Sequence, residues 1–139
     1  MLPSGKYPES FYRVSTKAFI RDKQGRILVI LEDGDKWTLP GGGLDHGESP
    51  LMGLKRELYE ELGTTDEFTA EFKGVDSYYY EPKQAWILWI MYELHFPHGL
   101  SYKITPEILA VKYVDDDYFK VPQHEYQKLI YRWSKKDSV

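Results

Sequence analysis

The chain contains no cysteine among its 139 residues. Disulfide bonds and thiolate metal sites are therefore excluded, which is consistent with a reducing compartment. Long hydrophobic runs are also missing. The longest is AWILWIMY at residues 85–92, which is too short to cross a bilayer and is typical of a buried strand. The first residues, MLPSGKYPES, lack the apolar segment of a signal peptide. We therefore expect a cytoplasmic protein with no membrane partner.

The sequence has no excess of positive charge. Lys and Arg number 18 against 22 Asp and Glu, which gives a formal net charge of −4. A protein that binds duplex nucleic acid normally carries a basic surface, so we expect no nucleic-acid partner. A small anionic substrate is not excluded, because a bound divalent cation reverses the local field.

Internal repeats, low-complexity blocks and linkers are also missing. The length suits one domain, and the hydrophobic fraction of 42% is sufficient for a core. Residues 1–10 are rich in proline, glycine and serine, so we expect them to form a flexible N-terminal arm. The single domain is predicted to span residues 11–139.

Aromatic and β-branched residues are abundant and predict several strands. The turn signals DKQG at 22–25 and EPKQ at 81–84 each lie between two of these strands, and DKQG predicts that the first two form a hairpin. The predicted strands are residues 12–20, 26–32, 36–39, 68–80, 85–96 and 108–114.

Two helices are predicted, one central and one C-terminal. Ser49 suits the N-cap of a helix at 50–62, Pro50 its first position and Gly63 its end. Its predicted apolar face consists of Leu51, Leu54, Leu58 and Leu62. The C-terminal helix follows Pro122 and should pack on a mixed sheet through Tyr126, Leu129, Ile130 and Trp133. These elements predict an α/β or α+β layered domain.

Three glutamates of the central helix, Glu57, Glu60 and Glu61, are spaced so that they share one face. Like charges at this spacing destabilise a bare helix by roughly 0.2–0.5 kcal/mol per pair. Mg²⁺ or Mn²⁺ would remove this repulsion, since hard divalent cations prefer oxygen ligands. The alternative is an ordinary solvated helix face, which the glutamates alone do not exclude.

The helix and the glycine-rich loop before it together resemble the Nudix box, G-x5-E-x7-R-E-U-x-E-E-x-G-U, in which U is a bulky aliphatic residue. The matching residues are Gly42, Glu48, Arg56, Glu57, Leu58, Glu60, Glu61 and Gly63. Thr64 departs from the pattern, but it is β-branched and is expected to pack. The box covers 23 residues, and the order of the flanking strands is also similar to that family. The resemblance implies an α/β/α sandwich with a central mixed β-sheet.

The resemblance also implies an activity, namely metal-dependent hydrolysis of a pyrophosphate bond. The substrate would be a nucleoside diphosphate linked to another moiety, such as a nucleotide, a nucleotide sugar or a dinucleoside polyphosphate. Glu48 and Arg56 would pair to fix the loop against the helix, with metal contact by Glu48 as the alternative. The expected ligands of Mg²⁺ or Mn²⁺ are Glu57, Glu60, Glu61 and the carbonyl of Gly41.

Two glutamates are candidates for the general base that takes the proton of the attacking water. Glu57 is the simpler one, because it belongs to the box. Glu107 precedes the strand at 108–114, and some members of the family carry their base on a downstream loop. The alternative for Glu107 is a plain loop residue.

Substrate contacts are expected outside the metal ligands. Trp37 and Tyr80 are candidates for stacking a base, although aromatic residues on strands more often pack within a core. Gly42 and Gly43 would let the backbone approach a phosphate. Arg21 is a candidate contact for an anionic group, although solvated charge is the alternative for it and for Arg13 and Lys17.

Two functional classes follow. The first is a pyrophosphohydrolase acting on a small nucleotide-type molecule, and the second is a catalytically silent Nudix-fold sensor that binds a nucleotide. The presence of all three helix glutamates and of Arg56 favours the enzyme. Action on capped RNA would need a basic channel, which the net charge does not suggest. A monomer and a homodimer are both compatible with the sequence.

Overall fold

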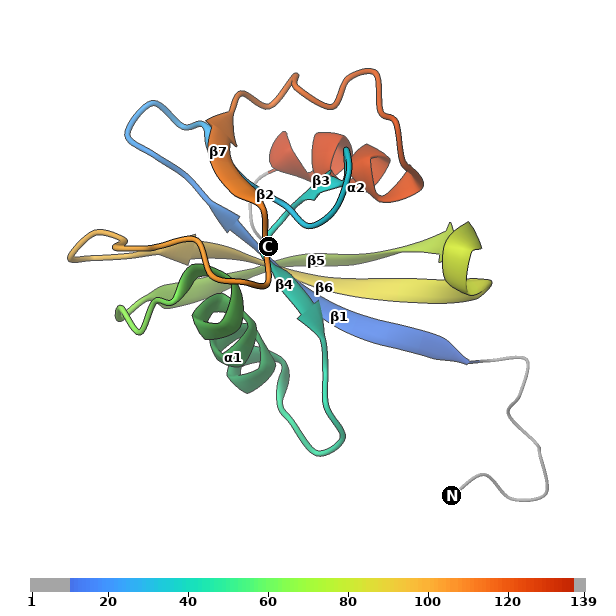
Figure 1. The fold of residues 1–139 in the computed structure, drawn as a ribbon, viewed down its shortest axis with the longest axis horizontal. Coiled ribbons are helices and arrows are strands. Elements are labelled where there is room, and N and C mark those ends of the chain that lie inside the picture. The colour runs from blue at the N-terminus through green and yellow to red at the C-terminus, as the bar shows by residue number, and fades with distance from the viewer. Residues whose placement is uncertain (1–10, 137–139) are drawn as a thin grey trace.

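The computed structural model describes residues 11–136, so the predicted N-terminal arm lies outside the described residues. Within residues 11–136, neither helix is long and apolar enough to cross a membrane. Figure 1 shows the elements, which follow the order β1 (Tyr12–Ile20), β2 (Ile27–Leu31), β3 (Trp37–Thr38), β4 (Gly41–Gly43), α1 (Pro50–Leu62), β5 (Thr69–Tyr80), the 3₁₀ turn η3 (Glu81–Lys83), β6 (Ala85–His95), β7 (Ala110–Val114) and α2 (Glu125–Ser134).

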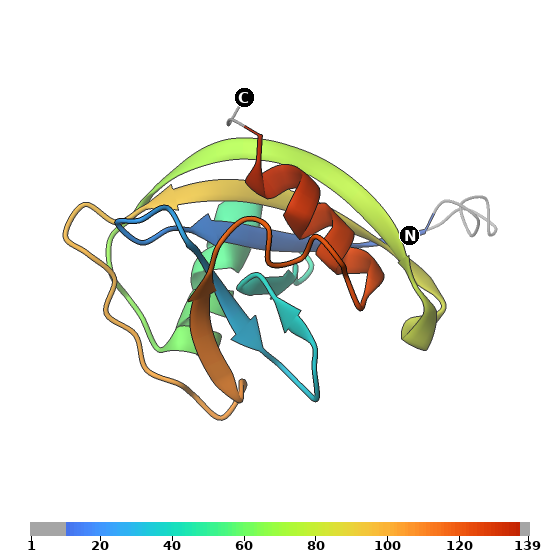
Figure 2. The ribbon, with the colours of Figure 1, turned by 90° about the horizontal axis from the view of Figure 1, so that it is seen from above.

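The large sheet has the strand order β4-β1-β6-β5. Strands β1 and β6 run parallel from the pair Tyr12–Trp86 to the pair Ile20–Leu94. The β1–β4 and β5–β6 pairs are antiparallel. The predicted central mixed sheet is therefore confirmed. Figure 2 shows β5 as the outer edge of this sheet.

A small antiparallel sheet of β3, β2 and β7 was not foreseen. The sequence predicted that β1 and β2 form a hairpin, and this is wrong. The two strands belong to different sheets. One isolated antiparallel bridge links Arg21, which follows β1, to Ile27 at the start of β2. Strands β4 and β6 occupy both edges of β1 at Ser15–Lys17, so a hairpin ladder between β1 and β2 could not continue past these residues.

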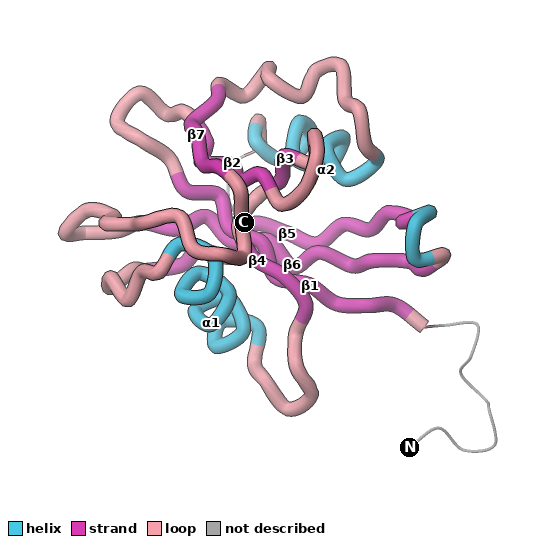
Figure 3. The backbone as a smooth tube through the Cα atoms, viewed as in Figure 1, coloured by secondary structure: helices cyan, strands magenta, loops and turns pink. Residues whose placement is uncertain are grey.

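The glycine-rich segment was predicted as a loop, but its first part is the strand β4. Gly41, Gly42 and Gly43 pair with Lys17, Thr16 and Ser15 of β1. A Cβ atom on Gly41 would lie 2.0 Å from the carbonyl oxygen of Thr16, and the φ of Gly41 is +127°. Glycine is therefore required for the close approach of the two strands. Residues 44–49 form the remaining loop, which leads into α1 in Figure 3.

Helix α1 has the predicted boundaries and caps. The Ser49 hydroxyl accepts a hydrogen bond from the Met52 N–H at 3.3 Å, and Gly63 ends the helix in the left-handed region. Leu54, Leu58 and Leu62 are buried, but Leu51 is 40% exposed, so its assignment to the apolar face is wrong. Leu51 lies in the first turn, where the neighbouring Met52 is also exposed. Thr64 is buried as expected.

The two helices cover opposite faces of the large sheet. Alternate residues of β1 separate into two clusters, since Ala18 and Ile20 pack with the leucines of α1 whereas Phe19 packs with Leu129 and Ile130 of α2. In Figure 1, α2 lies above and α1 below the strands of the large sheet. This arrangement confirms the predicted α/β/α sandwich and the predicted apolar stripe of α2.

Candidate active site

Arg56 contacts most of the polar residues that lie between the loop at 44–49 and helix α1. Its guanidinium donates to the carboxylate of Glu48 at 2.7 Å and to the carbonyl of Gly43 at 2.9 Å. It also lies 3.1 Å from a carboxylate oxygen of Glu57 and 3.1 Å from one of Glu60. The predicted pair of Glu48 and Arg56 is thus present, and it fixes the loop to the helix.

Glu48 is held in its ionised form by this pair. The hydrogen bond from Arg56, followed by that from the Asp45 N–H, lowers the pKa of the Glu48 carboxyl to about 2. The hydrogen bond to Glu48, followed by that to Glu57, raises the pKa of Arg56 above its usual range. The ion pair therefore persists over the physiological pH range.

Glu61 lies inside the protein, next to strand β4. Its side chain accepts a hydrogen bond from the Gly41 N–H at 2.9 Å, and the residue is 5% exposed. Burial raises the pKa of the Glu61 carboxyl to about 8, against an opposing effect of the nearby Lys17 ammonium. Negative charge on Glu57 and Glu32 adds to the increase.

Glu57 lies directly against strand β4. A Cβ atom on Gly42 would be 2.7 Å from the Glu57 carboxylate, so a side chain at position 42 would displace it. Burial also raises the pKa of the Glu57 carboxyl above its ordinary value, although Arg56 opposes the effect. The glycine-rich strand and the helix carboxylates are therefore in contact, as the sequence pattern suggested.

Lys17 is a functional candidate for which the sequence left two alternatives, contact with an anionic group and solvated charge. The residue is buried, and its ammonium donates to the carbonyls of Leu39 at 3.1 Å and Gly41 at 3.3 Å. It also lies 5.2 Å from the centre of the Trp89 ring. The signal that could have identified it is alternation, because Arg13, Ser15 and Lys17 occupy one face of a strand.

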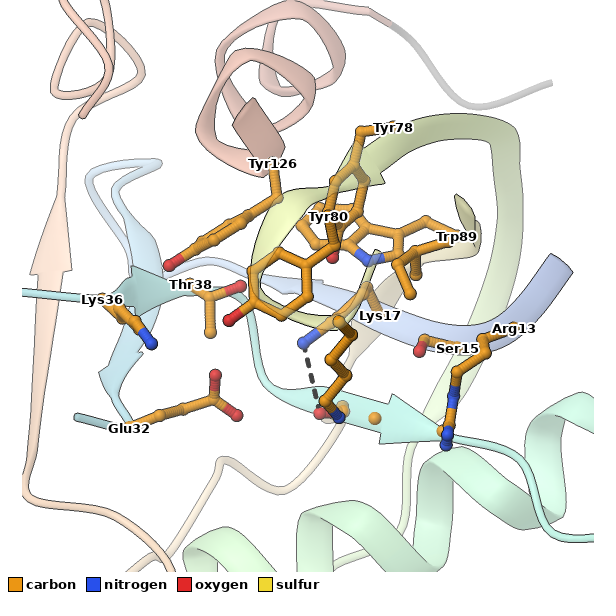
Figure 4. Close-up of a pocket in the computed structure, with 15 residues that line it drawn as sticks. Arg13, Ser15, Lys17, Glu32, Lys36, Thr38, Tyr78, Tyr80, Trp89 and Tyr126 are labelled. Carbon is orange, nitrogen blue, oxygen red and sulfur yellow. Dashed lines mark hydrogen bonds between the residues drawn. The ribbon is translucent and has the colours of Figure 1, made fainter. Parts of the chain in front are cut away.

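A cleft opens on the side of β4 that faces away from α1, and Figure 4 shows its lining. Its volume of about 210 Å³ is below the 300–1,000 Å³ of typical small-molecule sites, so it would enclose only part of a nucleotide. Cationic, aromatic and hydroxyl groups share the lining with one carboxylate. The residues are Arg13, Ser15, Lys17, Glu32, Lys36, Thr38, Gly41, Gly42, Gly43, Tyr78, Tyr80, Lys83, Ile87, Trp89 and Tyr126.

Three of the five predicted substrate contacts line this cleft, namely Gly42, Gly43 and Tyr80. Trp37 and Arg21 do not. The Lys112 ammonium covers the Trp37 ring at 4.1 Å from its centre.

Arg21 is engaged in structural contacts. Its guanidinium donates to the Glu93 carboxylate at 2.9 Å and to the carbonyls of Gly25 at 3.2 Å and Ser134 at 3.0 Å. Arg21 thus lies outside the cleft lining and helps to hold α2 on the sheet.

Glu107 lies on the loop between β6 and β7, outside the cleft lining. The side chain is exposed, and its N–H donates to the Thr105 hydroxyl. That hydroxyl in turn donates to the carbonyls of Glu60 and Glu61. The loop is therefore anchored to the end of α1, two residues from Glu107.

The residues expected to hold a divalent cation fit it in chemistry. All are oxygen donors, and buried Glu61 and half-buried Glu57 have carboxyl groups that a nearby cation would keep ionised. The three carboxylates do not converge, however, and residues 11–136 contain no group of three acidic or histidine side chains at metal-binding distance. Arg56 holds Glu57 and Glu60, and Lys17 holds the Gly41 carbonyl. Binding of a divalent cation would require the side chains of Glu57 and Glu60 to move away from Arg56.

Comparison with known proteins agrees with this geometry. The family model of the NUDIX domain matches residues 11–134. The chain belongs to the NUDIX family. An RNA pyrophosphohydrolase of Ruthia magnifica is 35% identical over 105 residues, which cover 74% of this chain and 51% of that relative. Another RNA pyrophosphohydrolase, from Psychrobacter, is matched over 31% of its length. The chain thus spans about half or less of these two relatives.

Solved structures support the same fold. The MutT protein of Methanosarcina mazei superposes with a TM-score of 0.72 at 22% identity, covering 90% of this chain and 96% of that one. The dihydroneopterin triphosphate pyrophosphohydrolase of E. coli gives a TM-score of 0.70 at 20% identity, covering 88% and 97%. At these identities the NUDIX chain shares the fold with its neighbours, and its activity has to be inferred from its own residues.

Proposed function

We propose that this NUDIX protein hydrolyses a pyrophosphate bond in a nucleoside diphosphate linked to another moiety, with Mg²⁺ or Mn²⁺ as cofactor. One observation carries the proposal. Strand β4 has the carboxylates of Glu57 and Glu61 against one side and the cleft with its cations and aromatic rings on the other. The reacting phosphates would lie along β4, next to both groups.

The chain would supply binding and orientation. Arg13, Lys17 and Lys83 in the cleft provide positive charge for an anionic phosphate chain. Gly43 leaves room for phosphate oxygens to approach the backbone, whereas the missing side chain of Gly42 makes room for the Glu57 carboxylate. Glu57, Glu60, Glu61 and the Gly41 carbonyl would hold the divalent ion, which when bound neutralises phosphate charge.

In the hydrolysis, the oxygen of a water attacks one phosphorus of the anhydride, and the bond from that phosphorus to the bridging oxygen breaks. The proton of the water goes to a carboxylate. Glu57 is our candidate base, because burial raises the pKa of its carboxyl and so favours proton uptake. Glu107 is the second candidate, on the loop anchored to α1 through Thr105.

The substrate class is proposed from the cleft and from the relatives. A partly enclosed cleft with Tyr80 and Trp89 in its lining suits a planar base, with the rest of the substrate outside. Two curated relatives are named RNA pyrophosphohydrolases, which makes a 5′-triphosphate RNA the competing substrate. The net charge of −4 favours the small molecule. Cytoplasmic location, the domain limits 11–139 and the choice between monomer and homodimer stay predictions.

The test is phosphate release from a substrate panel with Mg²⁺ or Mn²⁺, with added phosphatase where the product requires it. The panel contains nucleoside triphosphates, oxidised nucleotides, ADP-ribose, nucleotide sugars, diadenosine polyphosphates and a 5′-triphosphate RNA. Glu61→Gln removes one expected metal ligand, and Glu71→Gln is the matched control, because Glu71 is exposed on β5 away from the cleft lining.

Turnover of a small nucleotide by the wild type and Glu71→Gln, with a loss of at least roughly 100-fold in Glu61→Gln, would support the proposal. Turnover of RNA alone would replace the substrate class and retain the reaction. Tight binding of one compound without turnover of any would overturn the enzyme and support the catalytically silent sensor.

A further inference from the structure

Among residues 11–136, the hydroxyl of Tyr126 has no hydrogen-bond partner. Tyr126 lies in the first turn of α2 and is 5% exposed, and its ring lines the cleft. Within residues 11–136, two buried side-chain oxygens lack a partner, this one and Oγ1 of Thr16. Thr16 does not line the cleft. A buried hydroxyl without a partner destabilises the free protein, and in a binding cleft it is a group that a ligand can satisfy.

The surroundings of Tyr126 define the shape of that ligand. Its ring centre lies 5.9 Å from that of Tyr78, 6.2 Å from that of Trp89 and 6.5 Å from that of Tyr80. The other face of the ring is stacked on His124 at 5.4 Å with parallel planes. The packed rings fix the position of the hydroxyl and form an aromatic wall that suits a planar group.

The polar groups of the cleft separate into two ends. Figure 4 shows the side chains of Lys36 and Thr38 on the same side of the cleft as the Tyr126 hydroxyl, with Arg13 and Ser15 on the opposite side. One end therefore offers both donors and acceptors, which match the edge of a heterocycle. The other end adjoins β4, where the phosphates would lie.

We propose that Tyr126 is a specificity-determining residue whose hydroxyl hydrogen-bonds the polar edge of a nucleobase held in the cleft. This inference rests on the proposed function, because it assumes a nucleotide substrate. The hydroxyl is shielded from bulk water in the free protein, so a base that reaches it moves a lining side chain aside. A hydroxyl that both donates and accepts would favour some bases over others.

The test compares wild type with Tyr126→Phe and Tyr131→Phe. Each variant loses one hydroxyl from α2, but Tyr131 lies outside the cleft, with the Lys135 ammonium 5.0 Å from the centre of its ring. Calorimetry would measure the affinity for ADP, GDP, CDP, UDP and tripolyphosphate, which has no base. Thermal unfolding of the free proteins would be measured in parallel.

We expect Tyr126→Phe to weaken the preferred nucleotide by roughly 10-fold, the value of one hydrogen bond, and to leave tripolyphosphate unchanged. Its unfolding midpoint should equal or exceed that of the wild type, because an unpaired buried oxygen has been removed. If the Tyr126 hydroxyl had a purely structural role, Tyr126→Phe would have a lower unfolding midpoint than the wild type. Tyr131→Phe should retain all affinities.

Two results would overturn the inference while leaving the proposed function in place. One is equal affinity of Tyr126→Phe and wild type for all four nucleotides. The other is a parallel loss of nucleotide and tripolyphosphate affinity together with a lower unfolding midpoint. Wild-type protein that binds tripolyphosphate but no nucleotide would overturn both this inference and the nucleotide substrate.

Discussion

At the scale of single residues, Glu61 shows the largest increase in carboxyl pKa among the glutamates of the box. Its carboxyl is buried beneath β4 and accepts the Gly41 N–H. Burial raises its pKa from 4.5 to about 8 despite the nearby Lys17 ammonium, so protonation of this carboxyl is favoured near neutral pH when no divalent ion is bound. A carboxyl of this kind couples protonation to both folding and cation binding.

The first prediction concerns the stability of the protein in EDTA. The pKa of Glu61 is higher in the folded state than in the unfolded chain, so its proton stabilises the fold below pH 4.5. This contribution is lost as the pH rises from 4.5 to about 8. Glu61→Gln keeps an acceptor for the Gly41 N–H but does not titrate. Its free energy of unfolding relative to the wild type should therefore increase over this pH range, as measured by urea denaturation.

Glu71→Gln is the control for this measurement, since it removes the same charge from an exposed position. The stability curve of Glu71→Gln gives the effect of removing an exposed carboxylate, against which the curve of Glu61→Gln is compared. Parallel stability curves for Glu61→Gln and the wild type would show that Glu61 ionises normally in the folded protein.

The residues of the box could be predicted from the sequence because their spacing within one loop and one helix is local. The pair of Glu48 and Arg56 is an example. The contacts of Lys17 and the unpaired hydroxyl of Tyr126 could not be predicted, because they depend on strands and a helix far apart in the chain. The ion pair of Arg21 could not be predicted for the same reason, since its partner Glu93 is 72 positions away.

At the scale of elements, α1 positions the carboxylates through its apolar contacts. Leu54 is fully buried in the cluster on the α1 side of the sheet, whereas Leu51 on the same helix is 40% exposed. Leu54→Ala should destabilise the protein by about 2–5 kcal/mol, and Leu51→Ala by less than about 0.5 kcal/mol. Chemical denaturation of both variants checks this, and equal losses would mean that the first turn of α1 is packed in solution.

The elements themselves were largely predictable, since capping residues and hydrophobic periodicity are local signals. Which strands pair with one another was less predictable. A turn at 22–25 predicts a chain reversal. However, β4 and β6 pair with β1, and β2 pairs with β7 in the small sheet. The strand character of Gly41–Gly43 was hidden, because glycine has low intrinsic preference for strands.

At the scale of the whole molecule, the cleft exists only in the complete fold. Its lining comes from the large sheet, from residues around β2 and β3 of the small sheet, and from α2. A ligand bound there, or a cation bound at α1, would favour the folded state over the unfolded chain by mass action. The global stability of the protein is therefore a readout of the site that does not depend on turnover.

The last prediction uses this readout for the divalent cation. Mn²⁺ at a hundred times its dissociation constant should add about 2.7 kcal/mol to the free energy of unfolding. At one fixed Mn²⁺ concentration, the increase should be larger at pH 8 than at pH 6, because the ion binds ionised carboxylates and the pKa of Glu61 is about 8. Glu57→Gln should lose most of the increase, whereas Glu71→Gln should retain it. Equal stabilisation of both variants by Mn²⁺ would mean that the ion binds outside the α1 carboxylates, and the proposed ligand set would then be wrong.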